Sequence, residues 1–192
     1  YDRFGKKIKV TEINTGFHID NLGGNRELRR RNIPIYGSNL TCKLLKTKSK
    51  TTMSKMDVWL KNPMYKKYRD VYRKFVFAEP TNVFDINEKQ IVTLGSEKVE
   101  VFFPGPTHTY DNLVVYIPGK KILFGGCMIL SAETTKLGFT DDGNVNEWAE
   151  SIVKVKARYS NINLVVPGHG KVGGINLLDH TIAVVNEFTR KQ

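Results

Sequence analysis

The sequence Asn14-Thr15-Gly16-Phe17-His18-Ile19-Asp20 follows a β-prone run at residues 7–13 and ends on two side chains that can bind metal. His18 and Asp20 stand two residues apart, so in an extended segment their side chains point the same way. Three later loops also follow apolar runs, and they contain His108, Cys127 and His169. Because loops that leave strands often carry function, these four loops are the candidates for a site.

The rest of the chain predicts strands with helices outside them. We expect strands at residues 33–36 and 162–166, and an antiparallel meander at 91–124 with turns at 95–98 and 118–121. Helical patterns end at Arg31, break at Asn62-Pro63, continue over 64–77 and recur at 145–159 and 175–185, whereas residues 14–25 look irregular. The pattern predicts an α/β (in some schemes α+β) fold in a single domain, residues 1–192.

Charge is distributed unevenly along the 192 residues. The formal net charge is +11, and residues 43–74 hold eleven Lys and Arg against Asp57 and Asp70, so 11 − 2 = +9 falls in that segment. Such a stretch is most often a solvated helix face, but it could also attract nucleic acid, an anionic membrane surface or an acidic substrate. The sequence contains no apolar run long enough to span a membrane, and its first residues lack the apolar run of a signal peptide.

The cysteines and histidines divide into structural and functional candidates. The contexts of Cys42 and Cys127 do not suggest a disulfide; Cys42 is expected on a helix as a small buried residue, and His180 as a structural residue in the last helix. Imidazole, thiolate and carboxylate groups are zinc ligands, and a catalytic zinc keeps three protein ligands and one open position.

At these loops the sequence resembles the metallo-β-lactamases, in particular the true zinc β-lactamases. Four motifs occur in the family's order: residues 14–25, 103–112, 123–127 and 165–170. In the wider superfamily's nucleases and glyoxalases a histidine follows the aspartate, whereas here Asn21 follows Asp20 and Cys127 is present. The resemblance implies an αββα sandwich, a helix extended beside the active site, and a periplasmic or secreted protein.

The resemblance also implies the ligand sets. In two-zinc members three histidines hold the first zinc, and an aspartate, a cysteine and a histidine hold the second. The second set is complete as Asp20, Cys127 and His169. The first keeps only His18 and His108, because Gly16 replaces its first histidine. We therefore predict one tightly bound zinc and a weak second site, as in a mono-zinc, carbapenem-selective subclass that also lacks this histidine.

Other positions depart from the family. Leu130 stands where a lysine usually holds the substrate carboxylate, and Phe139 stands where a substrate-contacting Asn is common. Lys136 and Asn112 are therefore the predicted substrate-binding residues. Most of the family's N-terminal sheet is expected to be absent from this chain, so we expect a fragment, or a surface that a partner chain covers through self-association.

The leading functional hypothesis is zinc-dependent hydrolysis of the β-lactam amide, with water as nucleophile. His18, helped by Asp20, would act as general base, and His108 would donate to the developing oxyanion. One alternative is a degenerate family member that binds metal with little turnover. A nucleic-acid-processing enzyme is a weaker alternative, because Asn21 and Cys127 speak against it and the chain has no aromatic stacking motif.

Overall fold

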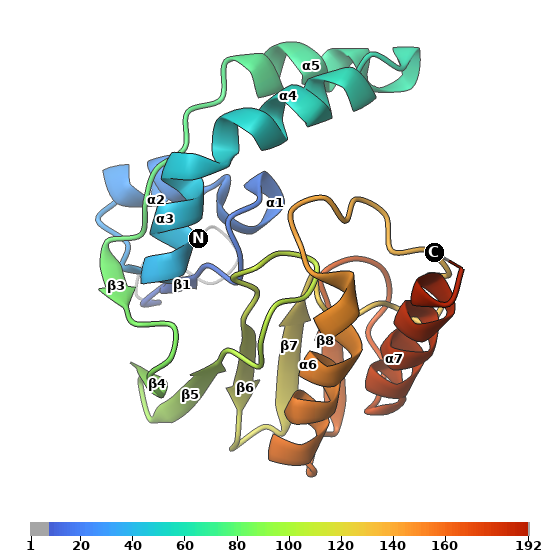
Figure 1. Ribbon diagram of the computed structural model, residues 1–192. Helices are drawn as coiled ribbons and strands as arrows, with labels where there is room; N and C mark the ends of the chain where they lie inside the picture. The colour runs from blue at the N-terminus through green and yellow to red at the C-terminus, as the bar shows by residue number, and fades with distance from the viewer. Residues whose placement is uncertain (1–7, 192) are drawn as a thin grey trace.

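The computed structural model describes residues 8–191, without the side chain of Trp59, and it consists of two facing sheets flanked by helices (Figure 1). The larger sheet has the strand order β4-β5-β6-β7-β8, and the smaller has the order β1-β2-β3. The strands of the larger sheet are Gln90–Leu94, Glu97–Phe102, Val114–Ile117, Ile122–Gly126 and Leu164–Pro167. Both predicted hairpins are confirmed, since β4 pairs antiparallel with β5 and β6 with β7.

Strands β7 and β8 run parallel, so their carboxyl ends meet at one edge of the sheet. The Gly168 amide donates to the carbonyl of Gly126 at 2.7 Å, which joins the two loops directly. A Cβ on Gly168 would lie 2.8 Å from the backbone nitrogen of Cys127, so only glycine allows this approach. The crossover between β7 and β8 thereby brings Cys127 and His169 side by side.

Helices α6 (Val145–Arg158) and α7 (Asn176–Thr189) cover one face of the larger sheet (Figure 1). Both match the predicted amphipathic helices. Trp148, Ile152 and Val155 are fully buried against the sheet, and burial of each such side chain contributes about 1.5–3 kcal/mol. Asn144 caps α6 by accepting a hydrogen bond from the backbone of Asn146.

The smaller parallel sheet packs on the opposite face. It consists of β1 (Glu12–Ile13), β2 (Ile35–Ser38) and β3 (Asn82–Phe84). The strand predicted at 7–13 is thus shorter than expected, and Lys7 lies outside the described residues. Apolar side chains from both sheets form one core cluster between the layers, including Val99, Val101, Leu113, Ile13 and Tyr36.

Residues 14–25 are more regular than the sequence predicted. Helix α1 (Ile19–Leu22) starts where the His18 carbonyl accepts the amides of Asn21 and Leu22, and α2 (Asn25–Arg30) is the predicted basic helix. Sequence patterns do not indicate α1, because four residues have almost no intrinsic helical stability. Tertiary packing fixes it, since Leu22 is buried in a cluster with Phe17 and Leu44.

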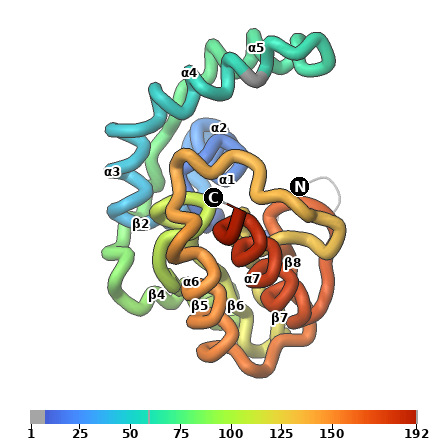
Figure 2. Tube along the Cα trace, turned by 45° about the vertical axis from the view of Figure 1, so that its right-hand side comes forward, coloured from blue at the N-terminus to red at the C-terminus, as the bar shows by residue number. Residues whose placement is uncertain are grey.

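Helices α3 (Asn39–Thr47), α4 (Ser49–Trp59), η1 (Pro63–Tyr65) and α5 (Lys66–Arg73) form the predicted basic region. Ser38 caps α3 through the Thr41 amide, and the expected break at Asn62-Pro63 is confirmed. Helix α5 ends at Arg73 and not at Phe77, which packs back onto the body beside Phe17. Figure 2 shows α4 and α5 extending beyond the sheets as an arm. Within residues 8–191, no helix is long and apolar enough to cross a bilayer.

Candidate metal centre

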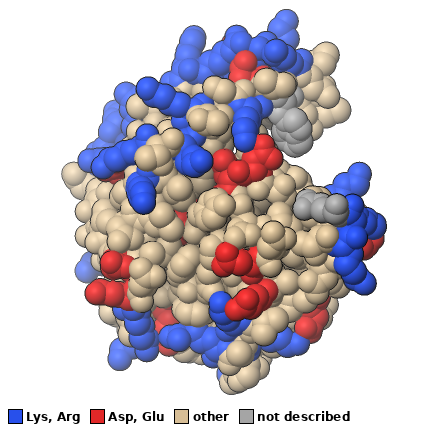
Figure 3. Space-filling model, in the orientation of Figure 1, with Lys and Arg blue, Asp and Glu red and all other residues tan. Residues whose placement is uncertain are grey.

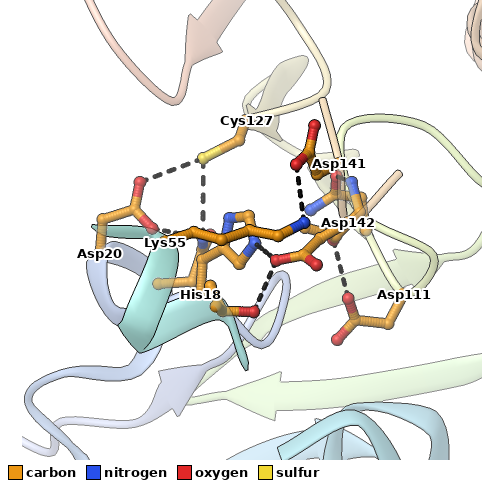
Figure 4. Close-up of polar contacts among 11 residues, drawn as sticks. His18, Asp20, Lys55, Asp111, Cys127, Asp141 and Asp142 are labelled. Atoms are coloured by element: carbon orange, nitrogen blue, oxygen red, sulfur yellow. Dashed lines mark hydrogen bonds and ion pairs between the residues drawn. The ribbon is translucent and has the colours of Figure 1, made fainter. Parts of the chain in front are cut away.

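Asp20 from helix α1 and Cys127 and His169 from the loops after β7 and β8 come together at the edge of the larger sheet. The Cys127 sulfur lies 3.4 Å from Asp20 Oδ2 and 3.6 Å from His169 Nε2, and His169 Nε2 lies 3.0 Å from the same carboxylate oxygen. Figure 4 shows the Asp20 carboxylate pointing to the Cys127 sulfur. Among the described residues 8–191, these three form the group that could hold a metal ion.

The spacing of these atoms fits zinc. Zinc bonds of about 2.0–2.3 Å in tetrahedral geometry separate neighbouring ligand atoms by roughly 3.3–3.7 Å. The two distances from the Cys127 sulfur, 3.4 and 3.6 Å, fall in that range, and the 3.0 Å between His169 Nε2 and Asp20 Oδ2 is somewhat shorter. Cys127 is buried, whereas the His169 side chain is 72% exposed, so one side of the cluster is open. The donor set and its open side match a catalytic zinc site with three protein ligands.

Cys127 has little tendency to ionise unless a cation is bound. Burial, followed by the negative charge of Asp20, raises the pKa of the Cys127 thiol to about 12. In the metal-free protein the thiol therefore donates its proton to Asp20 Oδ2. Zinc binds the thiolate, so binding must release this proton.

The Asn21 side chain orients two of the three ligands, Asp20 and Cys127. Its amide nitrogen lies 3.1 Å from Asp20 Oδ1 and 3.6 Å from the Cys127 sulfur, and its amide oxygen accepts from the Thr15 hydroxyl at 2.7 Å. The amide thus donates to two ligands of the cluster. Partners of this kind orient metal ligands.

His18 does not join the cluster. Its Nε2 lies 3.1 Å from Asp142 Oδ2, and the same oxygen accepts the Thr52 hydroxyl from helix α4 at 2.6 Å (Figure 4). The expectation that Asp20 supports His18 is therefore wrong. Asp20 lies in the first turn of α1 and points to Cys127 and His169, so Asp142 is the carboxylate that holds His18.

Asp142 is a charged partner for His18. Burial works to raise the pKa of the Asp142 carboxyl, but hydrogen bonds from His18 and Thr52 outweigh it and hold the pKa below its ordinary value. His18, Thr52 and Asp142 are all buried, with residue exposures of 9% or less. The ionised carboxylate thus fixes the orientation of the His18 ring.

His108 is the second histidine that lies near the cluster without joining it. Its ring centroid is 5.2 Å from that of His18 and 5.8 Å from that of Trp148. Burial, with a smaller contribution from the charge of His18, lowers the pKa of His108 to about 4, so its ring is neutral near pH 7. Asp111 anchors the His108 loop, because its carboxylate accepts the hydroxyls of Thr109 and, from α3, Thr41.

Gly16 lies where the resemblance implies a third histidine, and the space beside it is filled. A Cβ on Gly16 would lie 2.7 Å from the amide nitrogen of Asn112. Asn112 is fully buried, binds Thr15, Thr107 and Thr109, and is not among the residues that line the cavity over the cluster, so its predicted contact with substrate stays a prediction. Its amide can satisfy several backbone and hydroxyl groups at once, which is why it lies inside the loop.

A cavity of about 510 Å³ opens over the cluster. One wall is apolar and includes side chains from the arm, from the segment that follows it and from the loop at 137–139: Met53, Met56, Tyr72, Phe77, Leu137 and Phe139. Lys136 is the one Lys or Arg among its lining residues, and Leu130 lines it as well. The cavity therefore suits a largely apolar molecule that carries a negative charge.

A family model described as the metallo-beta-lactamase superfamily matches residues 13–169 of this sequence. The match covers most of the chain and includes all five candidate metal ligands. The chain belongs to the metallo-β-lactamase superfamily.

Two curated metallo-β-lactamases illustrate the relationship. A type 2 metallo-β-lactamase of Bacillus cereus is 39% identical over 177 residues, which are 92% of this chain and 58% of that protein. One from Pseudomonas aeruginosa is 36% identical over the same shares. The chain thus spans somewhat more than half the length of these relatives.

Solved structures agree with this membership. The metallo-β-lactamase from Pontibacter korlensis has a TM-score of 0.70 at 30% identity, covering 92% of this chain and 69% of that one. The structure of VMB-1 has a TM-score of 0.75 at 35% identity, covering 98% of this chain and 72% of that one. The predicted α/β metallo-β-lactamase fold is confirmed.

Sequence reasoning missed two members of this metallo-β-lactamase site, Thr52 and Asp142. Asp142 is 124 positions from His18 along the chain. The available signal was the pair of acids Asp141 and Asp142 in a glycine-bounded loop, but acidic pairs in loops are usually solvated. The two acids have different environments only in the folded chain, where Asp141 pairs with Lys55 at the surface and Asp142 is buried.

Proposed function

We propose that this protein hydrolyses the amide bond of β-lactams with one zinc ion held by Asp20, Cys127 and His169. The observation that carries the proposal is the triangle of three ligand atoms, all within 4.8 Å of one another, at the floor of the cavity. When bound, zinc supplies Lewis-acid stabilisation of negative charge that develops on the substrate. Superfamily membership supports this chemistry.

His18 is the proposed proton acceptor. With Nε2 donating to the ionised Asp142, the lone pair on Nδ1 is free to take a proton from the attacking water. The carboxylate fixes the tautomer and stabilises the imidazolium that forms, as carboxylates do for other catalytic histidines. The Thr52 hydroxyl orients Asp142 from the arm.

The remaining lining residues bind and orient the substrate. His108, neutral near pH 7, donates one N–H to the carbonyl oxygen as negative charge develops there. Lys136 pairs with the substrate carboxylate, and it can do so as a point charge without fixed geometry. The apolar wall excludes water from the bond that breaks.

The test measures zinc content and hydrolysis together. Purified protein is freed of metal, titrated with zinc, and assayed with a chromogenic cephalosporin and a carbapenem. We expect activity to saturate at about one zinc per chain and to favour the carbapenem. Saturation at two tightly bound zinc ions would contradict the mono-zinc proposal. Cys127→Ala is the inactive control.

Two observations favour a second candidate function, metal binding with little turnover. Gly16 leaves His18 and His108 without a third imidazole, and Leu130 offers no charge where a lysine would bind substrate. If the zinc-loaded protein hydrolyses neither substrate, this second function replaces the first. We also propose that the protein is periplasmic or secreted and that it self-associates. Sedimentation of the purified protein tests the self-association.

A further inference from the structure

Helix α5 packs on the rest of the arm through its charged side. Arg69 and Arg73, one turn apart, each form paired hydrogen bonds with the Asp57 carboxylate on α4, at 2.8–3.1 Å. The side of α5 that faces α4 is therefore the guanidinium side. This arrangement reverses the usual one, in which a helix buries its apolar side.

The apolar side of the same segment faces solvent. Met64, Tyr68 and Val71 fall at the four- and three-residue spacing of one helix face, and they are 72%, 51% and 67% exposed. We call these three residues the apolar stripe. Tyr72, the next residue, lines the cavity, so the stripe begins beside the site and continues onto the outer surface.

The segment that contains the apolar stripe also carries lysines without an ionic partner. Within residues 43–74, seven lysines form no ion pair with any described residue: Lys43, Lys48, Lys50, Lys61, Lys66, Lys67 and Lys74. Figure 3 shows Lys and Arg side chains gathered over α4 and α5. The surface of the arm therefore combines unbalanced positive charge with exposed apolar side chains.

We propose that the arm binds the surface of an anionic lipid bilayer, with the apolar stripe among the acyl chains and the lysines on lipid phosphates. Interfacial helices have this composition: a strong apolar side, a Lys-rich polar side and few apolar residues outside the stripe. The charge favours an anionic membrane over a second copy of this chain, because residues 43–74 carry a net +9 and two such segments would repel each other. Nucleic acid would engage the lysines but leave the stripe exposed to water.

The arm can dock without rearranging the catalytic residues. Thr52 and Lys55 of α4 bind Asp142 and Asp141 of the loop beside the cavity, so they hold the base of the arm on the body. None of the three stripe residues contacts the ligand cluster or lines the cavity. The inference is therefore independent of the proposed hydrolysis.

Co-sedimentation with lipid vesicles tests the proposal. The protein is mixed with vesicles of phosphatidylcholine alone, or with phosphatidylglycerol added in equal amount, at low and high salt. We expect at least about tenfold tighter binding to the anionic vesicles, and weakening by salt, since a lysine near such a surface contributes about fivefold in affinity. The triple variant Met64→Ser, Tyr68→Ser and Val71→Ser should bind about tenfold more weakly.

A charge variant and matched controls complete the design. Lys61→Glu, Lys66→Glu and Lys67→Glu together should abolish binding even if the serine variant does not fold. The controls are Val153→Ser with Val172→Ser, which are exposed valines outside the arm, and Lys89→Glu with Lys98→Glu, which are exposed lysines that form no ion pair with a described residue. Both controls should bind as the wild type does.

Three results would overturn the proposal. The first is equal binding to both kinds of vesicle, or none to either. The second is loss of binding in the controls to the same extent as in the arm variants. The third is a wild-type protein that sediments as a dimer and a serine variant that sediments as a monomer with unchanged lipid affinity. The apolar stripe would then join two copies of the chain.

Discussion

Two neighbouring groups of side chains in the cavity differ in what surrounds them. In Asp20, Cys127 and His169, the ligand atoms face one another across an open-sided gap. In His18 and His108, one ring is bound to Asp142 and the other is partly buried beside Trp148. Both groups consist of residues that can bind zinc, yet among the described residues only the first brings three ligand atoms within 4.8 Å of one another. Ligand type alone therefore does not make a metal site.

The strongest test of this comparison removes one ligand from the first group. Cys127→Ala should lower zinc affinity at least about 100-fold, because even loss of a residue that only orients a ligand costs about 10–100-fold. Competition with a metal-binding dye measures the affinity. Cys42→Ala removes the other buried thiol, in α3, and should leave zinc binding unchanged. Equal loss in both variants would contradict the site.

The second test separates the two groups. Asp142→Asn should lower kcat/KM about 10–100-fold, because the neutral amide no longer stabilises the His18 imidazolium, while the zinc affinity of the cysteine site stays the same. Asp141→Asn is the matched control, since Asp141 forms only an exposed pair with Lys55. A loss of zinc binding in Asp142→Asn would mean that His18 holds the same ion.

The third test concerns the position where the second group lacks a ligand. Gly16→Ala should lower the free energy of unfolding by about 1–3 kcal/mol, because its Cβ would press on Asn112, whose side chain is held by three hydroxyl and backbone partners. Denaturant unfolding measures the change. In Gly24→Ala the new Cβ meets only Leu28 at an ordinary 3.9 Å, so that control should be nearly neutral. Equal stability of both variants would contradict the filled space.

The smallest expected effect lies at the junction with the arm. Thr52→Val should lower the free energy of unfolding by about 1 kcal/mol, because Asp142 loses one hydrogen-bond donor. Thr52→Ser keeps the hydroxyl and should restore most of this loss. If serine and valine variants behave alike in unfolding and in kcat, Thr52 has only a packing role.

Much of the fold could be predicted from the sequence because it depends on local patterns. The two hairpins, the break at Asn62-Pro63 and the two C-terminal helices follow from turn residues and apolar spacing. Helix α1 could not be predicted, because its stability comes from the burial of Leu22. Asn112 was predicted to bind substrate, and the sequence could not show that its side chain is buried among Thr15, Thr107 and Thr109, because those contacts form only in the folded loop.

Ligand types and their order along the chain are encoded in the sequence alone, and they are enough to indicate the superfamily. Which residues act together depends on the folded chain. Folding brings Asp142 to His18 across 124 positions, fills the space beside Gly16 with Asn112, and turns the charged side of α5 toward Asp57. Hydrogen bonds and ion pairs depend on distances of a few ångströms, which topology sets and which spacing along the chain does not encode.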